Sequence, residues 1–180
     1  MKITFYGGVQ SVTGANYLLE HEGVKILIDC GLFQGSRYAE SLNYEKFPYS
    51  PEEVDFLFIT HSHTDHIGRI PKLTKEGFKG KIYATGPTIH LSQVALEDNL
   101  DLLRDEAHEQ GKEPLFSKKD LDESIGKAQA VDYEQILDLG SGIEARLHDA
   151  AHILGSAIIE IAWFDEKKEK KKIYFTGDLG

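Results

Sequence analysis

Residues 61–66, with the sequence HSHTDH, contain four side chains of the types that bind metal ions, three imidazoles and one carboxylate. His61 and His63 lie two residues apart, so in an extended backbone both rings face the same side and can bind one ion. Asp65 and His66 follow after the chain has turned, and reach a neighbouring point more easily. The spacing therefore predicts two adjacent metal sites. A purification tag would instead be a terminal run of consecutive histidines.

The segment before this motif, residues 54–60, is an apolar run rich in strand-forming side chains. The segment after it, residues 67–71, can begin a helix. This pattern places the candidate ligands on a turn at the end of a buried strand. Because a strand fixes the direction of the chain while a turn lets side chains converge, this placement favours a metal centre over a solvated loop.

Further candidate ligands stand where other predicted strands end. His152 lies at a turn between two strand patterns, whereas His148 belongs to the preceding strand, so we favour His152. Asp178 follows an apolar strand and has glycines nearby, which suits a carboxylate that bridges two cations. Asp29 ends another apolar strand, where it either holds a ligand histidine in one tautomer or is an ordinary turn residue. The pattern alone favours neither role for Asp29.

The rest of the chain alternates between strand and helix patterns, which indicates an α/β fold. Asp120 completes a variant of the capping box at the start of one helix, and His90 and His108 are expected on the surface of another. We expect strands at 2–6, 16–21, 24–30, 54–60 and 81–85 and near 130–133, 143–148, 157–164 and 173–176, helices at 71–77, at 87–110 and after Ser117, and a loop at 31–53.

The composition describes a globular chain: of its 180 residues 41% are hydrophobic and 10% aromatic, enough for one domain with a substantial core. No apolar run is long enough to span a membrane, so we expect no membrane partner. Cys30 is the only cysteine, which excludes a disulfide within the chain. Together with an N-terminal strand pattern in place of a signal peptide, this predicts a cytoplasmic location.

The formal net charge of −10 is unlike that of a protein with an extended basic surface for nucleic acid. However, two divalent ions would add about four positive charges where a phosphate binds, and the formal charge omits them. The charge therefore does not exclude a phosphodiesterase. Residues 165–172 carry charges of both signs and are expected to form a solvated hairpin tip.

The HSHTDH motif after a buried strand, followed by His152 and Asp178 and preceded by Asp29, resembles the metallo-beta-lactamase superfamily. Four segments further resemble its beta-CASP branch of RNA-processing nucleases, which is related to the cleavage and polyadenylation endonuclease and to ribonuclease J. These segments are SVTGAN at 11–16, DCGLFQG at 29–35, HILGS at 152–156 and TGDLG at 176–180.

The resemblance implies the N-terminal portion of an αββα sandwich, with mixed β-sheets and outer helices. It also implies two zinc ions, with Asp29 supporting a ligand histidine from outside the ligand set. The implied ligands of one zinc are His61, His63 and His152, those of the other are Asp65 and His66, and Asp178 bridges the two ions. Ala151 stands where the family usually has glycine.

The function implied is zinc-dependent hydrolysis of RNA phosphodiester bonds by a metal-bridging hydroxide, which Asp65 also orients. Two alternatives remain open: a metallo-hydrolase of a small ester, thioester or lactone, and an inactive metal-binding fragment or interaction module. Family members continue into a beta-CASP insert and then return to complete the domain, supplying a further zinc-ligand histidine and a histidine acid. We therefore expect residues 1–180 to be the N-terminal part of such a domain, poorly active alone, with exposed apolar surface that promotes a homo-oligomer.

Overall fold

The computed structural model describes the whole chain, residues 1–180. The second and third strands of its first sheet form a hairpin that turns at Glu22 and Gly23. The six strands of this sheet lie in sequence order; β1, β2 and β3 pair antiparallel, whereas β4, β5 and β6 add in parallel. These strands are β1 (Lys2–Gly7), β2 (Asn16–His21), β3 (Val24–Ile28), β4 (Phe56–Phe58), β5 (Lys81–Ala84) and β6 (Ala128–Ala130).

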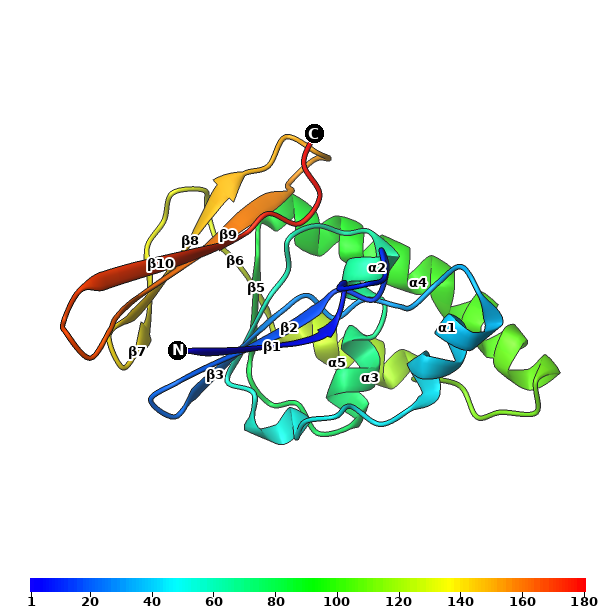
Figure 1. Ribbon diagram of the computed structural model, residues 1–180. Coiled ribbons are helices and arrows are strands. Elements are labelled where there is room, and N and C mark those ends of the chain that lie inside the picture. Colours follow the sequence, from blue (N-terminus) through cyan, green and yellow to red (C-terminus); the bar gives the residue numbers. More distant parts are fainter.

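Helices cover one face of this sheet, and a second sheet covers the other (Figure 1). The second sheet has the antiparallel order β10-β9-β8-β7. Its strands are β7 (Leu137–Gly140), β8 (Ile143–Asp149), β9 (Ala157–Phe164) and β10 (Lys170–Phe175). The helices are α1 (Arg37–Ser41), η1 (Leu42–Tyr44), η2 (Pro51–Glu53), α2 (Thr64–Ile67), α3 (Ile70–Lys75), α4 (Gly86–Glu109) and α5 (Lys118–Gly126).

The first sheet is apolar on both faces, because alternate residues of a strand point to opposite sides. Leu27 and Leu57 enter a core cluster with Leu73, Leu96 and other helix residues. Their neighbours along the strands, such as Ile28 and Phe58, enter a second cluster between the two sheets. The layers are therefore helix, sheet and sheet, and the predicted α/β class with mixed sheets and outer helices is confirmed.

Several predicted elements differ from the observed ones. Residues 31–53, expected as a loop, contain α1, η1 and η2, and β7 was not expected. The predicted strand at 54–60 is shorter because the Thr60 backbone N–H donates to the Asp29 carboxylate at 2.8 Å and not to a neighbouring strand. The predicted capping box is present: the Ser117 side chain accepts from the Asp120 N–H, and the Asp120 side chain accepts from the Ser117 N–H.

The outer face of the second sheet carries ion pairs beside exposed aromatic side chains, since Phe164 and Tyr174 are 49% and 50% exposed. Lys170 pairs with Glu144 at 2.6 Å, and Lys172 pairs with Glu160 at 2.9 Å. Exposed apolar side chains also lie on and after β1, where Phe5 and Val12 are 57% and 93% exposed. Self-association stays a prediction. None of the helices is long and apolar enough to cross a membrane.

Glu160 is the buried member of this charged face and generates a prediction about pH. Burial raises the pKa of its carboxyl, but hydrogen bonds with Lys172, Tyr174 and His148 lower it more, to about 2 from an ordinary 4.5. Because the folded pKa lies below the ordinary one, the stabilisation is complete above about pH 4.5 and is lost as the pH falls toward 2. Glu160→Gln should therefore lower the free energy of unfolding near neutral pH, with the deficit shrinking in that acidic window.

Urea unfolding of the wild type and of Glu160→Gln at several pH values measures this deficit. Glu166→Gln, on the exposed hairpin tip, is the control and should behave as wild type throughout. A deficit that is the same at pH values above and below the window would contradict the role assigned to Glu160.

Candidate metal centre

Four side chains from three distant segments bring their donor atoms to one point. One donor atom each from His61, His63, His152 and Asp178 lies within 4.8 Å of the others. His63 Nδ1 is 3.1 Å from His61 Nε2 and 3.3 Å from His152 Nε2. The Asp178 Oδ2 atom is 3.8 Å from His61 Nε2 and 3.7 Å from His152 Nε2.

These separations fit the donor set of a divalent ion. A tetrahedral zinc ion with bonds of about 2.0–2.1 Å places its ligand atoms about 3.3 Å apart. The four measured separations, 3.1 to 3.8 Å, bracket that value. Three imidazoles and one carboxylate are also ligands that zinc prefers. This group of donors therefore suits zinc or a similar ion.

A second, smaller group of donors adjoins the first. His66 Nε2 lies 3.5 Å from Asp178 Oδ1 and 3.8 Å from Asp65 Oδ2. The two oxygens of Asp178 thus face different groups, Oδ2 toward His61 and His152 and Oδ1 toward His66. A carboxylate placed in this way can bind two neighbouring ions at once.

The second half of the HSHTDH motif forms the short helix α2, which packs against the loop that follows β3. His63 is the N-terminal cap of α2, and Asp65 and His66 lie within that helix. The loop passes so close that a Cβ atom at Gly31 would lie 1.4 Å from the Asp65 carbonyl oxygen. Only glycine fits there, and this close approach positions α2 relative to the first sheet.

Asp29 is the buried acceptor that orients two of the histidines. Its carboxylate accepts from the Thr60 hydroxyl at 2.8 Å and faces His66 Nδ1 at 2.8 Å. The Thr60 hydroxyl in turn lies 3.0 Å from His61 Nδ1. This network assigns the proton to Nδ1 in both rings, so each Nε2 presents its lone pair to the donor group.

The electrostatics of the two rings differ. Burial, with the positive charge of His66 as a smaller contribution, lowers the pKa of His61 to about 4. Burial also lowers the pKa of His66, but the hydrogen bond and negative charge of Asp29 raise it more, so its pKa lies above the ordinary 6.5. His61 is therefore neutral at neutral pH, the form in which an imidazole binds a metal ion.

His152 lies on the turn between β8 and β9, which is held by a hydrogen bond within the turn and by two hydrogen bonds from the start of α4. The Ser156 hydroxyl accepts from the His152 N–H at 3.1 Å. The Gly155 carbonyl accepts from the hydroxyls of Thr85 and Thr88, at 2.6 and 2.8 Å, at the start of α4. Ala151 has a φ of +55°, a conformation that glycine adopts more easily, which gives a physical reason for the glycine that the family usually has there.

All six predicted ligands therefore lie in two adjoining groups, and Asp29 lies directly behind them. His148 is directed elsewhere, because its two ring nitrogens contact Glu134 and Glu160 on the outer face of the second sheet. His90 and His108 are exposed on α4, as predicted. Thr60 was not predicted, although its position directly before the first histidine was a usable signal. Nothing in the sequence pointed to Thr85 and Thr88.

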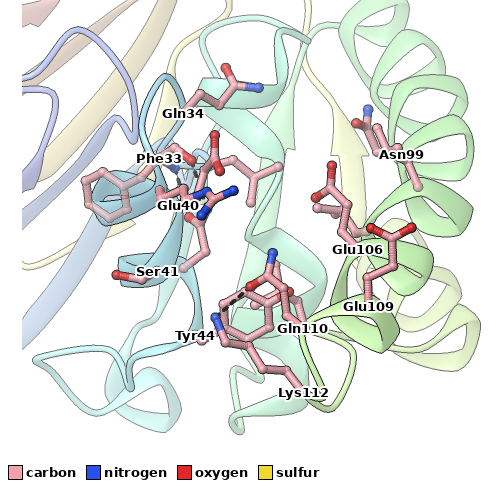
Figure 2. Close-up of a pocket in the computed structure, with 16 residues that line it drawn as sticks. Phe33, Gln34, Glu40, Ser41, Tyr44, Asn99, Glu106, Glu109, Gln110 and Lys112 are labelled. Atoms are coloured by element: carbon pink, nitrogen blue, oxygen red, sulfur yellow. Dashed lines mark hydrogen bonds between the residues drawn. The ribbon is translucent and has the colours of Figure 1, made fainter.

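A cavity of about 670 Å³ lies between the α1 region and the C-terminal half of α4. Figure 2 shows Glu40 on one side of it and Glu106 and Glu109 on the other, with Lys112 donating to Gln110 at 2.9 Å. None of the predicted ligands lines this cavity. Its lining of mixed charge shares no residue with the candidate metal centre.

The chain belongs to the metallo-beta-lactamase superfamily: the model of a Metallo-beta-lactamase superfamily domain matches residues 18–177. It is 36% identical to ribonuclease TTHA0252 of Thermus thermophilus over its full length, and spans 38% of that relative. It is 30% identical over 161 residues to the transcription termination factor FttA of Methanocaldococcus jannaschii, with 89% of the chain covered and 25% of the relative. The family predicted from the motifs is thus confirmed, and the relatives are of the RNA-related kind that the narrower resemblance implied.

Solved structures agree on the fold. BJP-1, a subclass B3 metallo-beta-lactamase of Bradyrhizobium japonicum, is similar with a TM-score of 0.55 and 21% identity, covering 92% of this chain and 56% of its own. The metallo-beta-lactamase SMB-1 gives a TM-score of 0.54 and 18% identity, with 91% and 57% covered. This fold implies divalent metal binding, and the cluster of histidine and aspartate donors agrees with it.

Thr60→Val tests the link between Asp29 and His61. The variant keeps the shape of the side chain and removes the hydroxyl that joins the two groups. We expect zinc affinity to fall about 10- to 100-fold, the usual effect of removing a partner that orients a metal ligand. Titration with zinc against a chromogenic chelator measures this. Thr74→Val is the control, since the Thr74 hydroxyl is buried without a partner, and an equal loss in both variants would contradict the assignment.

The two threonines that hold the His152 turn generate a second prediction. The double variant Thr85→Val, Thr88→Val leaves the Gly155 carbonyl without its two hydroxyl donors, so His152 should be held less firmly. We expect about tenfold weaker zinc binding and a changed absorption spectrum of the cobalt-substituted protein. Ser92→Ala removes a buried, unpartnered hydroxyl from the same helix and should change neither reading. An unchanged cobalt spectrum in the double variant would show that the turn needs no such support.

Proposed function

We propose that this chain carries the metal centre of a zinc-dependent hydrolase that cleaves RNA phosphodiester bonds. The observation that carries the proposal is the pair of adjoining donor groups that share Asp178. The choice of RNA is supported by the relatives, one named a ribonuclease and another a transcription termination factor.

The residues that would hold one zinc ion are His61, His63 and His152, and those for the other are Asp65 and His66, with Asp178 bridging. When bound, two such ions lower the pKa of a water molecule and neutralise charge on the reacting phosphorus. Asp29 keeps His66 in the tautomer that can bind, and Thr60 extends this effect to His61.

Asp65 is the carboxylate proposed to orient the attacking water. Its side chain is 21% exposed, so it can meet both the metal centre and the substrate. An oxygen of its side chain accepts the hydrogen bond that directs a lone pair of the water toward phosphorus. The buried Asp29 is already bonded to Thr60 and His66 and is not available for this task.

The second donor group has fewer residues than the first, and this bears on the domain organisation. Asp65 and His66 are its own donors, and Asp178 is shared. Because the chain spans 38% and 25% of the two relatives, we propose that residues 1–180 are the N-terminal part of a metallo-beta-lactamase domain. A beta-CASP insert and a C-terminal return would then supply a further histidine ligand and the acid for the leaving group.

The cytoplasm is the proposed location of this enzyme. Cys30 is a free, fully buried thiol, and burial raises its pKa to about 12, which makes it unreactive as a nucleophile. A chain without disulfides suits a reducing compartment.

His63→Ala should abolish zinc binding at the first group and lower the rate of RNA cleavage more than about a hundredfold. Metal content by plasma mass spectrometry and single-turnover cleavage of a labelled RNA measure the two effects. The whole wild-type protein should contain close to two zinc ions and lose its activity to a chelator. Residues 1–180 alone, whose second donor group has only Asp65 and His66 of its own, should hold the second ion weakly and be poorly active. His90→Ala, an exposed histidine on α4, should match the wild type in both assays.

The alternative functions give different results in the same assays. Cleavage by His63→Ala at the wild-type rate would contradict the proposal. Turnover of a thioester or lactone, with RNA untouched, would identify the carbonyl hydrolase. Metal binding without turnover of either substrate class by the whole protein would identify a binding module.

A further inference from the structure

A cavity of about 430 Å³ opens directly beside the metal centre, and the proposed function has so far made no use of it. His66 and Asp178 line one end of it. Phe5, Tyr17 and Phe175 line the other, with the loop that follows β1 along its rim. We call this cavity the aromatic groove. Because two candidate ligands line one end of the groove, a molecule bound in it lies next to the metal centre.

Three aromatic rings form a continuous row along the groove. The rings of Phe5 and Tyr17, paired across β1 and β2, lie 5.7 Å apart in an edge-to-face arrangement. Tyr17 and Phe175 stack at 5.6 Å with 27° between their planes. Phe175 ends β10 three residues before Asp178, so the row is attached directly to the shared carboxylate of the metal centre.

The outer end of the row is exposed. Phe5 is 57% exposed, whereas Phe175, at the inner end, is 9% exposed and belongs to the core between the sheets. On the rim, Val9 and Val12 are 50% and 93% exposed. Apolar side chains concentrated beside a polar centre are typical of a ligand-binding surface.

The charges of the groove restrict the chemistry of its occupant. No lysine or arginine lines it, so it offers no cation to a phosphate group. Of its two carboxylates, Asp29 is bonded to Thr60 and His66, and Asp178 belongs to the donor groups. The groove therefore suits a flat, uncharged group that stacks on an aromatic ring. In a polynucleotide that group is the base, and aromatic side chains are the usual platforms for unpaired RNA bases.

We infer that the aromatic groove binds the base of the nucleotide adjoining the scissile phosphate, stacked on Phe5; the inference rests on the proposed RNA substrate. The phosphate lies at the metal centre and the base at the aromatic row, so one groove fixes both parts of the nucleotide.

The hydroxyl groups that line the groove bear on which bases this subsite would prefer. The Ser11 hydroxyl donates to the Thr13 carbonyl, and the Thr176 hydroxyl donates to the Gly177 carbonyl. These two hydroxyls thus direct their protons to the backbone, whereas the Tyr17 hydroxyl also lines the groove. Stacking on the ring accepts all four bases, so the aromatic row provides affinity and position, and a preference among bases would come from the Tyr17 hydroxyl.

The test combines a protein variant with a change in the RNA. Single-stranded, phosphorothioate-linked RNA oligomers carry either an intact base or an abasic sugar beside the linkage that the wild type cleaves in unmodified RNA. Binding to the zinc-loaded protein is measured by fluorescence anisotropy. For the wild type, the abasic oligomer should bind about tenfold or more weakly, the usual loss of one stacked base. Phe5→Leu should bind the intact oligomer equally weakly and show no further loss with the abasic one.

Two variants separate stacking from folding. Phe5→Tyr keeps an aromatic face and should bind the intact oligomer as the wild type does, whereas Phe5→Leu keeps only apolar bulk. Tyr38→Ala removes a 78% exposed aromatic ring on α1, outside the groove, and should have no effect. Thermal unfolding verifies that Phe5→Leu is folded.

The outcomes distinguish this inference from the function on which it rests. Suppose that the wild type cleaves RNA, but Phe5→Leu shows the same difference in affinity between intact and abasic oligomers as the wild type. The base site is then wrong, while the proposed nuclease function is retained. If the wild type neither binds nor cleaves RNA with zinc supplied, the proposed function and the base site both fail.

Discussion

The arrangement of the metal centre depends on one buried carboxylate. Asp29 is fully buried, has a φ of +56°, and accepts hydrogen bonds from the backbone and hydroxyl of Thr60 while its Oδ2 faces His66 Nδ1. A buried carboxylate is stable only when such partners satisfy it, and here the partners are the strand end and the histidines themselves. The hydrogen bonds that satisfy the buried Asp29 carboxylate therefore also orient two candidate ligands, His61 and His66.

The two-sheet architecture supplies the remaining ligands. The first sheet contributes β4 and α2, with the HSHTDH motif, whereas His152 and Asp178 follow strands of the second sheet. Packing of Phe58 and Ile28 against Ile159 and other second-sheet residues fixes the distance between these two sources. The Thr60 carbonyl accepts from the Ala157 N–H at 2.7 Å, which joins the sheets directly at the ligand level. The core between the sheets is thus also the support of the candidate site.

The sequence predicted the parts of this site that are local and chemically distinctive. Residues 61–66 cluster in sequence, and His152 and Asp178 stand at recognisable strand ends, so their convergence could be expected before the structure; their role as ligands stays a prediction. The hydrogen bond from Thr85 to Gly155 joins residues 70 positions apart, and no local pattern reports it. β7 was missed because four residues that include an aspartate and a glycine give a weak strand signal.

Under the proposed function an acidic chain binds a polyanion, so the attraction for phosphate and the remaining affinity have to come from different contacts. With a formal net charge of −10 and no lysine or arginine beside the metal centre in the aromatic groove, the protein has no basic track there to attract the RNA backbone. Attraction for the phosphate then comes from bound cations, and the remaining affinity has to come from uncharged contacts. Stacking is the strongest such contact that a single base can make, and the aromatic row is the surface beside the metal centre that offers it. Under the proposed function, the acidic composition and the exposed Phe5, unrelated features in the sequence, are therefore two consequences of one mode of substrate binding.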